Sequence, residues 1–226
     1  MNLFLINILT VFGEFMKIFK MSPENPDMDL IGEAIDIMAD GGVILYPTDT
    51  VYGLGANIFN NDAVKRIYEI KKRDSSKPLS VLVEDMESME LIADLNKSSR
   101  EIISKWLPGP FTFILNKRKI VSPYVSASSK VGVRIPDYRI ARALASLFPI
   151  TTTSANLTNE DTLSNPQDIL KQLGNDIDLV IDVGDLDNAK PSTVIDLSTS
   201  KPTLVRNGFD SQDMDSIRDY LEKLNL

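Results

Sequence analysis

GGVILYPTDTVYGLGA, residues 41–56, contains the clearest signature of an α/β fold in this sequence. Its apolar run 43–46 has the length and β-branched content of a buried strand, and Pro47 ends that strand because proline has no N–H to donate to a neighbour. Hydroxyl and carboxyl side chains crowd the turn that follows: Thr48, Asp49, Thr50 and Tyr52. Open α/β sheets usually bind ligands at the ends of buried strands, so the stretch predicts a ligand-binding turn. The alternative is a threonine-rich turn with two structural glycines.

The composition limits the chemistry that the chain can perform. With 226 residues, 43% of them hydrophobic and 25% charged, the sequence predicts one globular domain, with or without a small appendage. It contains no cysteine and no histidine, so catalysis must rest on hydroxyls, carboxylates, Lys, Arg, backbone amides or a metal ion held by oxygen atoms. The absence of cysteine suits a reducing compartment, and we expect a cytoplasmic protein. The formal net charge of −8 argues against non-specific nucleic-acid binding by the whole surface.

Apolar runs of strand length alternate along the chain with segments of helical periodicity. The expected strands cover residues 16–20, 43–46, 79–83, 111–115, 131–135, 150–153, 179–183, 193–197 and 203–205. The expected helices are one capped by Asp27 or Asp29 and running to about 38, one capped by Asn61 or Asp62 and running to about 71, and those at 86–94, 98–106, 138–147, 166–172 and 210–224. This alternation predicts a layered α/β domain, and the sheet should be mixed because some neighbouring strands lack room for a helical crossover.

The N-terminal residues 1–15 are apolar but short, and Glu14 stands where a signal-peptide cleavage site would need small residues. They fit neither a signal peptide nor a membrane span, so we expect no membrane association. We predict an N-terminal extension over 1–15 and a catalytic domain over 16–226, opened by an edge strand at 16–20. Met16 as the natural start is a hypothesis.

Further polar clusters follow other predicted elements. Lys71 and Arg73 fall where the second helix ends, close enough to converge on one polyphosphate. The alternative is a solvated helix end that the helix dipole favours. Ser154 and Asn156, in the stretch ITTTSAN, could face one ligand, or could form an Asx or Ser turn that satisfies its own backbone.

Two arginines complete the set of polar strand ends. Arg134 ends the strand of VGVRIP, and Arg206 lies in LVRNG, after the Pro-Ser-Thr triplet that Thr193 closes. A single arginine on a strand more often forms a surface ion pair, but several polar clusters at strand ends in one small chain point to a binding site. Neither a P-loop motif nor a dinucleotide-binding glycine motif is present.

These motifs occur in an order that resembles one known family. PTDTVYGLGA, KKR, KPL, LPGPFTF, VGVRIP, TTSAN, PSTVID and LVRNG together resemble the YrdC family of L-threonylcarbamoyladenylate synthases, over roughly 16–208. The resemblance implies a single YrdC-like domain of the α/β class, with a twisted mixed parallel/antiparallel sheet flanked by helices and a concave basic groove. It also implies a nucleotidyltransferase that makes threonylcarbamoyl-AMP and pyrophosphate from L-threonine, bicarbonate and ATP. The product serves the threonylcarbamoyladenosine modification of tRNA.

The resemblance also implies roles for single residues. The family signature K-x-R plus S-x-N falls on Lys71, Arg73, Ser154 and Asn156. Lys71 and Arg73 are the expected catalytic residues and hold the ATP phosphates; the other expected ATP-binding residues are Ser154, Asn156 and Arg206. Expected contacts to threonine are Thr48, Arg134 at the carboxylate and Thr193 near the hydroxyl. Mg²⁺ is expected to bind with ATP, without a metal site made by the protein.

Two stretches depart from the family pattern. Leu82 stands where some relatives carry a histidine, so one polar contact to threonine is missing or replaced. The segment 158–166, TNEDTLSNP, differs from the Ser-Gly-x-Pro-Ser-Pro stretch common in relatives. No residue is assigned as a general base; Asp49 is a candidate for orienting a neighbouring group or the metal.

Other readings stay open at this point. The main alternative is a module binding structured or double-stranded RNA, including tRNA, through basic residues at 65–77 and 117–119. A different carbamoyl-transfer enzyme is a third reading, but such proteins carry additional domains and cysteines that this sequence lacks. For the synthase reading, the expected partner is a downstream tRNA threonylcarbamoyltransferase complex.

Overall fold

Strands and helices alternate along the whole described chain, as the sequence predicts. The computed structural model describes residues 7–11, 14–186, 190–208, 219 and 223. The helices are α1 Met28–Ala39, α2 Asn61–Ile70, α3 Met86–Ile92, α4 Lys97–Trp106, α5 Arg139–Leu144 and α6 Pro166–Leu173. The strands are β1 Asn7–Val11, β2 Glu14–Lys20, β3 Ile44–Tyr46, β4 Gly53–Gly55, β5 Ser80–Leu82, β6 Ala93–Asp94, β7 Phe111–Lys117, β8 Lys130–Arg134, β9 Ile150–Ser154, β10 Leu179–Asp182, β11 Thr193–Asp196 and β12 Thr203–Arg206.

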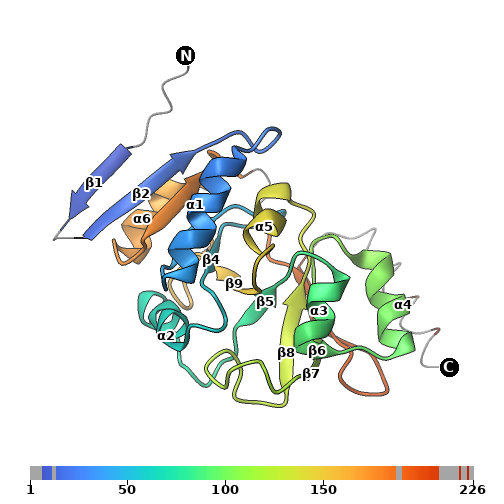
Figure 1. The fold of residues 1–226 in the computed structure, drawn as a ribbon. Coiled ribbons are helices and arrows are strands. Elements are labelled where there is room, and N and C mark those ends of the chain that lie inside the picture. The colour runs from blue at the N-terminus through green and yellow to red at the C-terminus, as the bar shows by residue number, and fades with distance from the viewer. Residues whose placement is uncertain (1–6, 12–13, 187–189, 209–218, 220–222, 224–226) are drawn as a thin grey trace.

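These strands join into one continuous sheet with helices packed around it (Figure 1). The strand order is β1-β2-β10-β3-β4-β9-β5-β8-β7-β11-β12, with β6 paired to β7. Strand β10 is parallel to β2 and β3, β5 is parallel to β8, and β7 is parallel to β11, while the other pairs are antiparallel. The predicted mixed α/β sheet is therefore confirmed.

One face of the sheet carries apolar side chains on the strands to either side of β9, whereas β9 itself places Thr153 and Thr151 on this face. The strand registers place Val180, Leu45 and Leu54 side by side, and likewise Val81 with Val133. Helices α2, α3, α4 and α6 pack their apolar residues against this face in the larger core. Burying these apolar side chains supplies the main driving force for folding.

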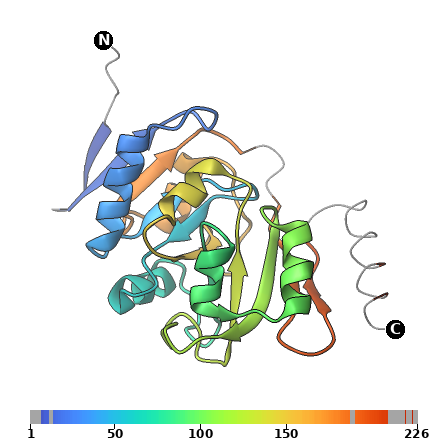
Figure 2. The same cartoon turned by 45° about the vertical axis from the view of Figure 1, so that its right-hand side comes forward.

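The opposite face is covered only in part. Helices α1 and α5 lie side by side and bury one end of this face, with Ile44 and Leu179 beneath them (Figures 1 and 2). Towards β5, β8 and β7 the same face carries Ser80, Thr112 and Arg134 instead of apolar side chains. Because side chains alternate between the two faces of a strand, these polar groups stand directly behind core residues. They line a cavity.

Three local predictions need correction. The second helix is capped by Asn60, whose Oδ1 accepts N–H groups of residues 62 and 63 at 3.2 and 3.0 Å, and not by Asn61 or Asp62. The strand at 16–20 is not an edge, because β1 pairs antiparallel with its outer side. The segment 86–94 is not helical to its end: α3 stops at 92, and β6 then pairs with β7.

The remaining predictions concern two helices and the two ends of the chain. Asp27 caps α1, with Oδ1 accepting N–H groups of Asp29 and Leu30 at 3.0 and 3.3 Å. The helix expected at 138–147 covers only residues 139–144. Residues 219 and 223 of the helix expected at 210–224 are helical, and the rest of that segment lies outside the described residues. In the extension expected at 1–15, residues 7–11 form β1 and residues 14–15 begin β2. Within the described chain, no helix combines the length and the apolar character that a membrane crossing requires.

Candidate functional site

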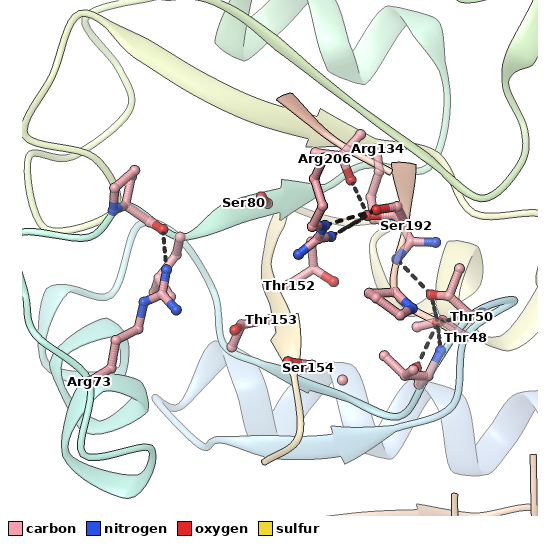
Figure 3. A pocket seen from close by; sticks show the side chains of 16 residues that line it. Thr48, Thr50, Arg73, Ser80, Arg134, Thr152, Thr153, Ser154, Ser192 and Arg206 are labelled. Atoms are coloured by element: carbon pink, nitrogen blue, oxygen red, sulfur yellow. Dashed lines mark hydrogen bonds between the residues drawn. The ribbon is translucent and has the colours of Figure 1, made fainter. Parts of the chain in front are cut away.

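A cavity of about 150 Å³ opens on the partly covered face of the sheet (Figure 3). Its lining comes from strands, from the turns beside them and from the loop after α2. It consists of Thr48, Thr50, Val51, Gly53, Arg73, Pro78, Leu79, Ser80, Thr112, Arg134, Thr152, Thr153, Ser154, Pro191, Ser192 and Arg206. Three of these residues are arginines and none is acidic. The lining therefore favours an anionic ligand.

The floor of the cavity is a row of hydroxyl groups. Ser80 of β5 faces Thr152 of β9 in the antiparallel register, and Ser154 of the same strand pairs with Gly53 of β4. Gly53 lets β4 pack closely against the buried ring of Tyr46, because a Cβ at this position would lie 3.2 Å from that ring. The floor offers donors and acceptors without a charge.

The turn after β3 forms one end of the cavity. Thr48 Oγ1 accepts the N–H groups of Thr50 and Val51 at 3.1 and 3.3 Å and donates to the Val51 carbonyl at 2.7 Å, so its hydroxyl is used to hold the turn. Arg134, at the end of β8, donates from Nη1 to Thr50 Oγ1 at 3.0 Å and pairs through Nη2 with Asp49. This end presents a fixed, buried guanidinium.

Arg73 lies across the cavity from Arg134 and Thr50 (Figure 3). Its Nε and Nη2 donate to the carbonyls of Lys77 and Pro78 at 3.4 and 3.0 Å. The helix α2 ends at residue 70, and the turn that follows aims Arg73 into the cavity. A second cation therefore stands at the opposite end of the hydroxyl floor.

Arg206 of β12 and Ser192 close the cavity from the side of the last hairpin. Arg206 donates from Nε and Nη2 to the Ser192 carbonyl at 3.1 and 2.9 Å, and from Nη2 to Ser192 Oγ at 3.1 Å. Ser192 Oγ in turn lies 2.8 Å from Thr112 Oγ1. Burial, and then the nearby charge of Arg134, lower the pKa of Arg206.

Lys71 lies behind the cavity wall and not in its lining. Its side chain is only 2% exposed, and Nζ donates to the carbonyls of Ser154 and Asn156, the latter at 2.6 Å. The Lys71 carbonyl accepts two hydrogen bonds from Thr158, both at 3.0 Å. Burial, and then the nearby charge of Arg73, lower the pKa of Lys71 to about 7. The lysine braces the 154–158 turn from inside.

The structure brings the residues singled out in the sequence to one place, in two layers. Those that line the cavity are Thr48, Arg73, Arg134, Ser154 and Arg206. Lys71, Asn156 and Thr193 lie directly behind them: Asn156 Oδ1 accepts from Ser154 Oγ at 2.6 Å, and Thr193 follows Ser192 in the chain. Leu82 is fully buried beneath α5 and does not line the cavity.

Sequence reasoning missed two lining residues, Ser80 and Thr112. Each is a small polar residue flanked by apolar ones, in LSVLV and FTFIL. A small polar residue inside an apolar strand indicates that one face of the strand lines a polar cavity while the other faces the core. This pattern could have identified both residues from the sequence.

A family model, curated relatives and solved structures all match this chain to the same protein family. The Sua5/YciO/YrdC family model, described as "Telomere recombination", matches residues 36–208. A putative threonylcarbamoyl-AMP synthase from Methanocaldococcus jannaschii is 37% identical over 196 residues, which cover 87% of this chain and 93% of the relative. The crystal structure of Escherichia coli YciO has a TM-score of 0.80 and 32% identity, covering 87% of this chain and 97% of YciO.

A longer relative has also been solved with a ligand. The crystal structure of Pyrococcus abyssi Sua5 complexed with L-threonine has a TM-score of 0.82 and 30% identity. The match covers 88% of this chain but 60% of that protein. The shared part is therefore the domain that contains the cavity.

Proposed function

The chain belongs to the Sua5/YciO/YrdC family, and from this premise we propose that it is a threonylcarbamoyl-AMP synthase that uses ATP, L-threonine and bicarbonate. Relatives from several organisms carry that enzyme name, which makes this chain a transferase of the nucleotidyltransferase type. The structure with L-threonine bound concerns Pyrococcus abyssi Sua5, and the amino acid comes to this chain by that similarity.

The arrangement of the arginines is the observation that carries the proposal. Arg134 stands at one end of a hydroxyl-lined cavity and Arg73 at the other (Figure 3). A planar guanidinium matches a carboxylate or a phosphate through paired hydrogen bonds. We assign Thr48 and Arg134 to threonine, with the Arg134 guanidinium at the carboxylate. Arg73, with Ser154 and Arg206, is assigned to the nucleotide.

The residues behind the wall have supporting roles in this proposal. Lys71 and Asn156 hold the turn that carries Ser154, and the Lys71 ammonium adds positive charge near the phosphates. Thr193 Oγ1 accepts the N–H of Gly208 at 3.3 Å and so supports the hairpin that carries Ser192 and Arg206.

The proposed reaction needs positioning and charge neutralisation more than a protein nucleophile. The threonine amine and bicarbonate give a carbamate, with loss of water. A carbamate oxygen then forms a bond to the α-phosphorus of ATP while the bond from that phosphorus to pyrophosphate breaks. Held donors and cations stabilise the charge that develops on the phosphoryl oxygens. A cavity of hydroxyls and arginines, without histidine or cysteine, supplies these groups.

The metal proposed here is Mg²⁺ carried by the nucleotide. No group of three or more acidic, His or Cys side chains that could hold a metal occurs in the described residues. The cavity offers neutral hydroxyls, which fit an ion that is held mainly by phosphates and water. When bound, such an ion neutralises the charge on the leaving phosphates.

The product is proposed to serve tRNA modification through a separate threonylcarbamoyltransferase. The RNA-binding alternative is not favoured, because relatives such as the Pyrococcus abyssi protein are named threonylcarbamoyl-AMP synthases and the site is a small cavity lined by side chains that suit a compact anion. A direct contact with tRNA stays a prediction.

An omission series tests the proposed function. The protein is incubated with ATP, Mg²⁺, bicarbonate and threonine, and pyrophosphate is measured with each component left out in turn. We expect pyrophosphate only in the complete mixture, and much less when serine replaces threonine. Pyrophosphate release that continues without threonine would contradict the proposal.

A further inference from the structure

The Asp49 carboxylate joins two segments at the Arg134 end of the cavity. Oδ1 accepts a hydrogen bond from Arg134 Nη2, and Oδ2 accepts the backbone N–H of Asp137 at 3.0 Å. The ion pair is nearly buried, with 6% of the Arg134 side chain and 10% of the Asp49 side chain exposed. Asp49 thus links the turn after β3 to the segment that leaves β8.

Two bonds from different nitrogens fix the guanidinium of Arg134. Nη1 donates to Thr50 Oγ1 at 3.0 Å, and Nη2 donates to Asp49. Since the group is planar, these two bonds set both its plane and its rotation. Nε is buried and makes no hydrogen bond to the described residues, so the terminal nitrogens alone hold the group.

Each terminal nitrogen keeps a second N–H outside these bonds, because a guanidinium has five donors in all. Arg134 lines the cavity, so this pair of N–H groups is what it can offer to a ligand. Two donors on one guanidinium can bind the two oxygens of a carboxylate. These N–H groups can bind a carboxylate well only while the orientation of the guanidinium is fixed.

We infer that Asp49, assisted by Thr50, is a positioning residue that presents Arg134 to the carboxylate of the amino-acid substrate. The inference rests on the proposed function. Asp49 does not touch the substrate; it compensates a buried cation and sets the direction of its free donors. Selectivity for an amino acid over the corresponding amino alcohol is the property that Asp49 controls.

The variant Asp49→Asn tests this role. Asparagine has the same size, but its amide places donors where the carboxylate accepts, so the bond to Arg134 or the bond to the Asp137 N–H must be lost. We would measure the affinity for L-threonine and for L-threoninol, whose carboxylate is replaced by CH₂OH, by calorimetry in the presence of a non-hydrolysable ATP analogue. The expected result is a loss of about tenfold or more for threonine and no change for threoninol or for the ATP analogue.

Two further variants make the test specific. Thr50→Val removes the neutral acceptor at Nη1 and should weaken threonine binding by about fivefold, again without an effect on threoninol. Asp137→Asn makes the same change of charge on a neighbouring exposed side chain that takes part in none of these bonds, and it should bind both compounds as the wild type does.

The outcomes separate this inference from the proposed function. A folded Asp49→Asn protein that keeps its threonine affinity overturns the inference, as does an equal loss for threonine and threoninol. Thermal melting shows whether the variant folds, and if it does not, the same comparison with Thr50→Val decides. Failure of the wild type to release pyrophosphate in the omission series contradicts the proposed function instead.

Discussion

Replacing Lys71 with methionine tests whether its buried amine braces the wall of the cavity. Nζ donates to the carbonyls of Ser154 and Asn156, and the side chain is 2% exposed. Methionine has a similar length and no donor, so both carbonyls lose a partner where water has little access. The 154–158 turn, which carries Ser154 into the cavity, should shift.

The size of the effect on stability follows from these two bonds. Losing two buried partners costs about 2–5 kcal/mol of unfolding free energy. We expect the lower end of that range at neutral pH, because the substitution also removes the cost of burying an ammonium group. Because the shifted turn carries Ser154 into the cavity, the synthase rate should fall on the order of 10²-fold.

The pH dependence gives a sharper signature. Burial lowers the pKa of Lys71 from 10.5 to about 7, so between these values the unfolded chain binds more protons than the folded chain. The contribution of this group to stability therefore rises with pH across that window and is lost as pH falls towards 7. From pH 7 to pH 9 the gain is about 2 kcal/mol. Burial raises the pKa of Tyr46 and Tyr138 to about 12, so tyrosine ionisation in the unfolded chain interferes only above about pH 10.

Urea unfolding at pH 7 and pH 9 measures this difference. The wild type should gain about 2 kcal/mol more than Lys71→Met between the two pH values. Lys72→Met is the control, because Lys72 is the exposed neighbour and should behave as the wild type. Parallel pH–stability curves for the wild type and Lys71→Met would refute the account of a buried, perturbed lysine.

The remaining predictions concern the cavity itself. Arg73→Ala should lower the rate on the order of 10²-fold with little change in melting temperature, because the side chain bonds only to carbonyls of its own loop; a near-normal turnover would rule out its assignment to phosphate. Gly132→Ala places a Cβ 2.8 Å from Ser80 Oγ and 3.3 Å from Thr112 Cγ2, so it should displace the hydroxyl groups of the cavity floor and raise KM by about fivefold. An unchanged KM would show that the floor does not contact the substrate. Chelation of divalent ions should abolish pyrophosphate release, and Mg²⁺ should restore it; activity that survives chelation would contradict a metal carried by the nucleotide.

Much of the architecture is predictable because local rules and the tertiary structure agree. The run 43–46 is apolar and bounded by Gly42 and Pro47, and its residues 44–46 form β3. Asp27 stands before a helical apolar pattern and caps α1. Polar clusters after strands also converge as expected, since the ends of neighbouring strands meet at one side of the sheet.

What the sequence could not supply depends on long-range pairing. Strand β4 is Gly-Leu-Gly, without a strand pattern of its own, and forms because it fits between β3 and β9. A Cβ on Gly55 would lie 2.7 Å from the Tyr46 ring, so close approach, and not propensity, explains that glycine. The burial of the Lys71 side chain also could not be predicted from the sequence, because it depends on hydrogen bonds to carbonyls of a turn more than 80 residues away in the chain.

Incorporation of labelled bicarbonate shows whether the protein makes threonylcarbamoyl-AMP. The protein is incubated with ATP, Mg²⁺, threonine and ¹³C-bicarbonate, and the nucleotide products are analysed by mass spectrometry. The account predicts an AMP adduct with the mass of threonylcarbamoyl-AMP, one mass unit heavier than the adduct made from unlabelled bicarbonate and formed only when threonine is present. An AMP product without the label, or no adduct although ATP is bound, would contradict it.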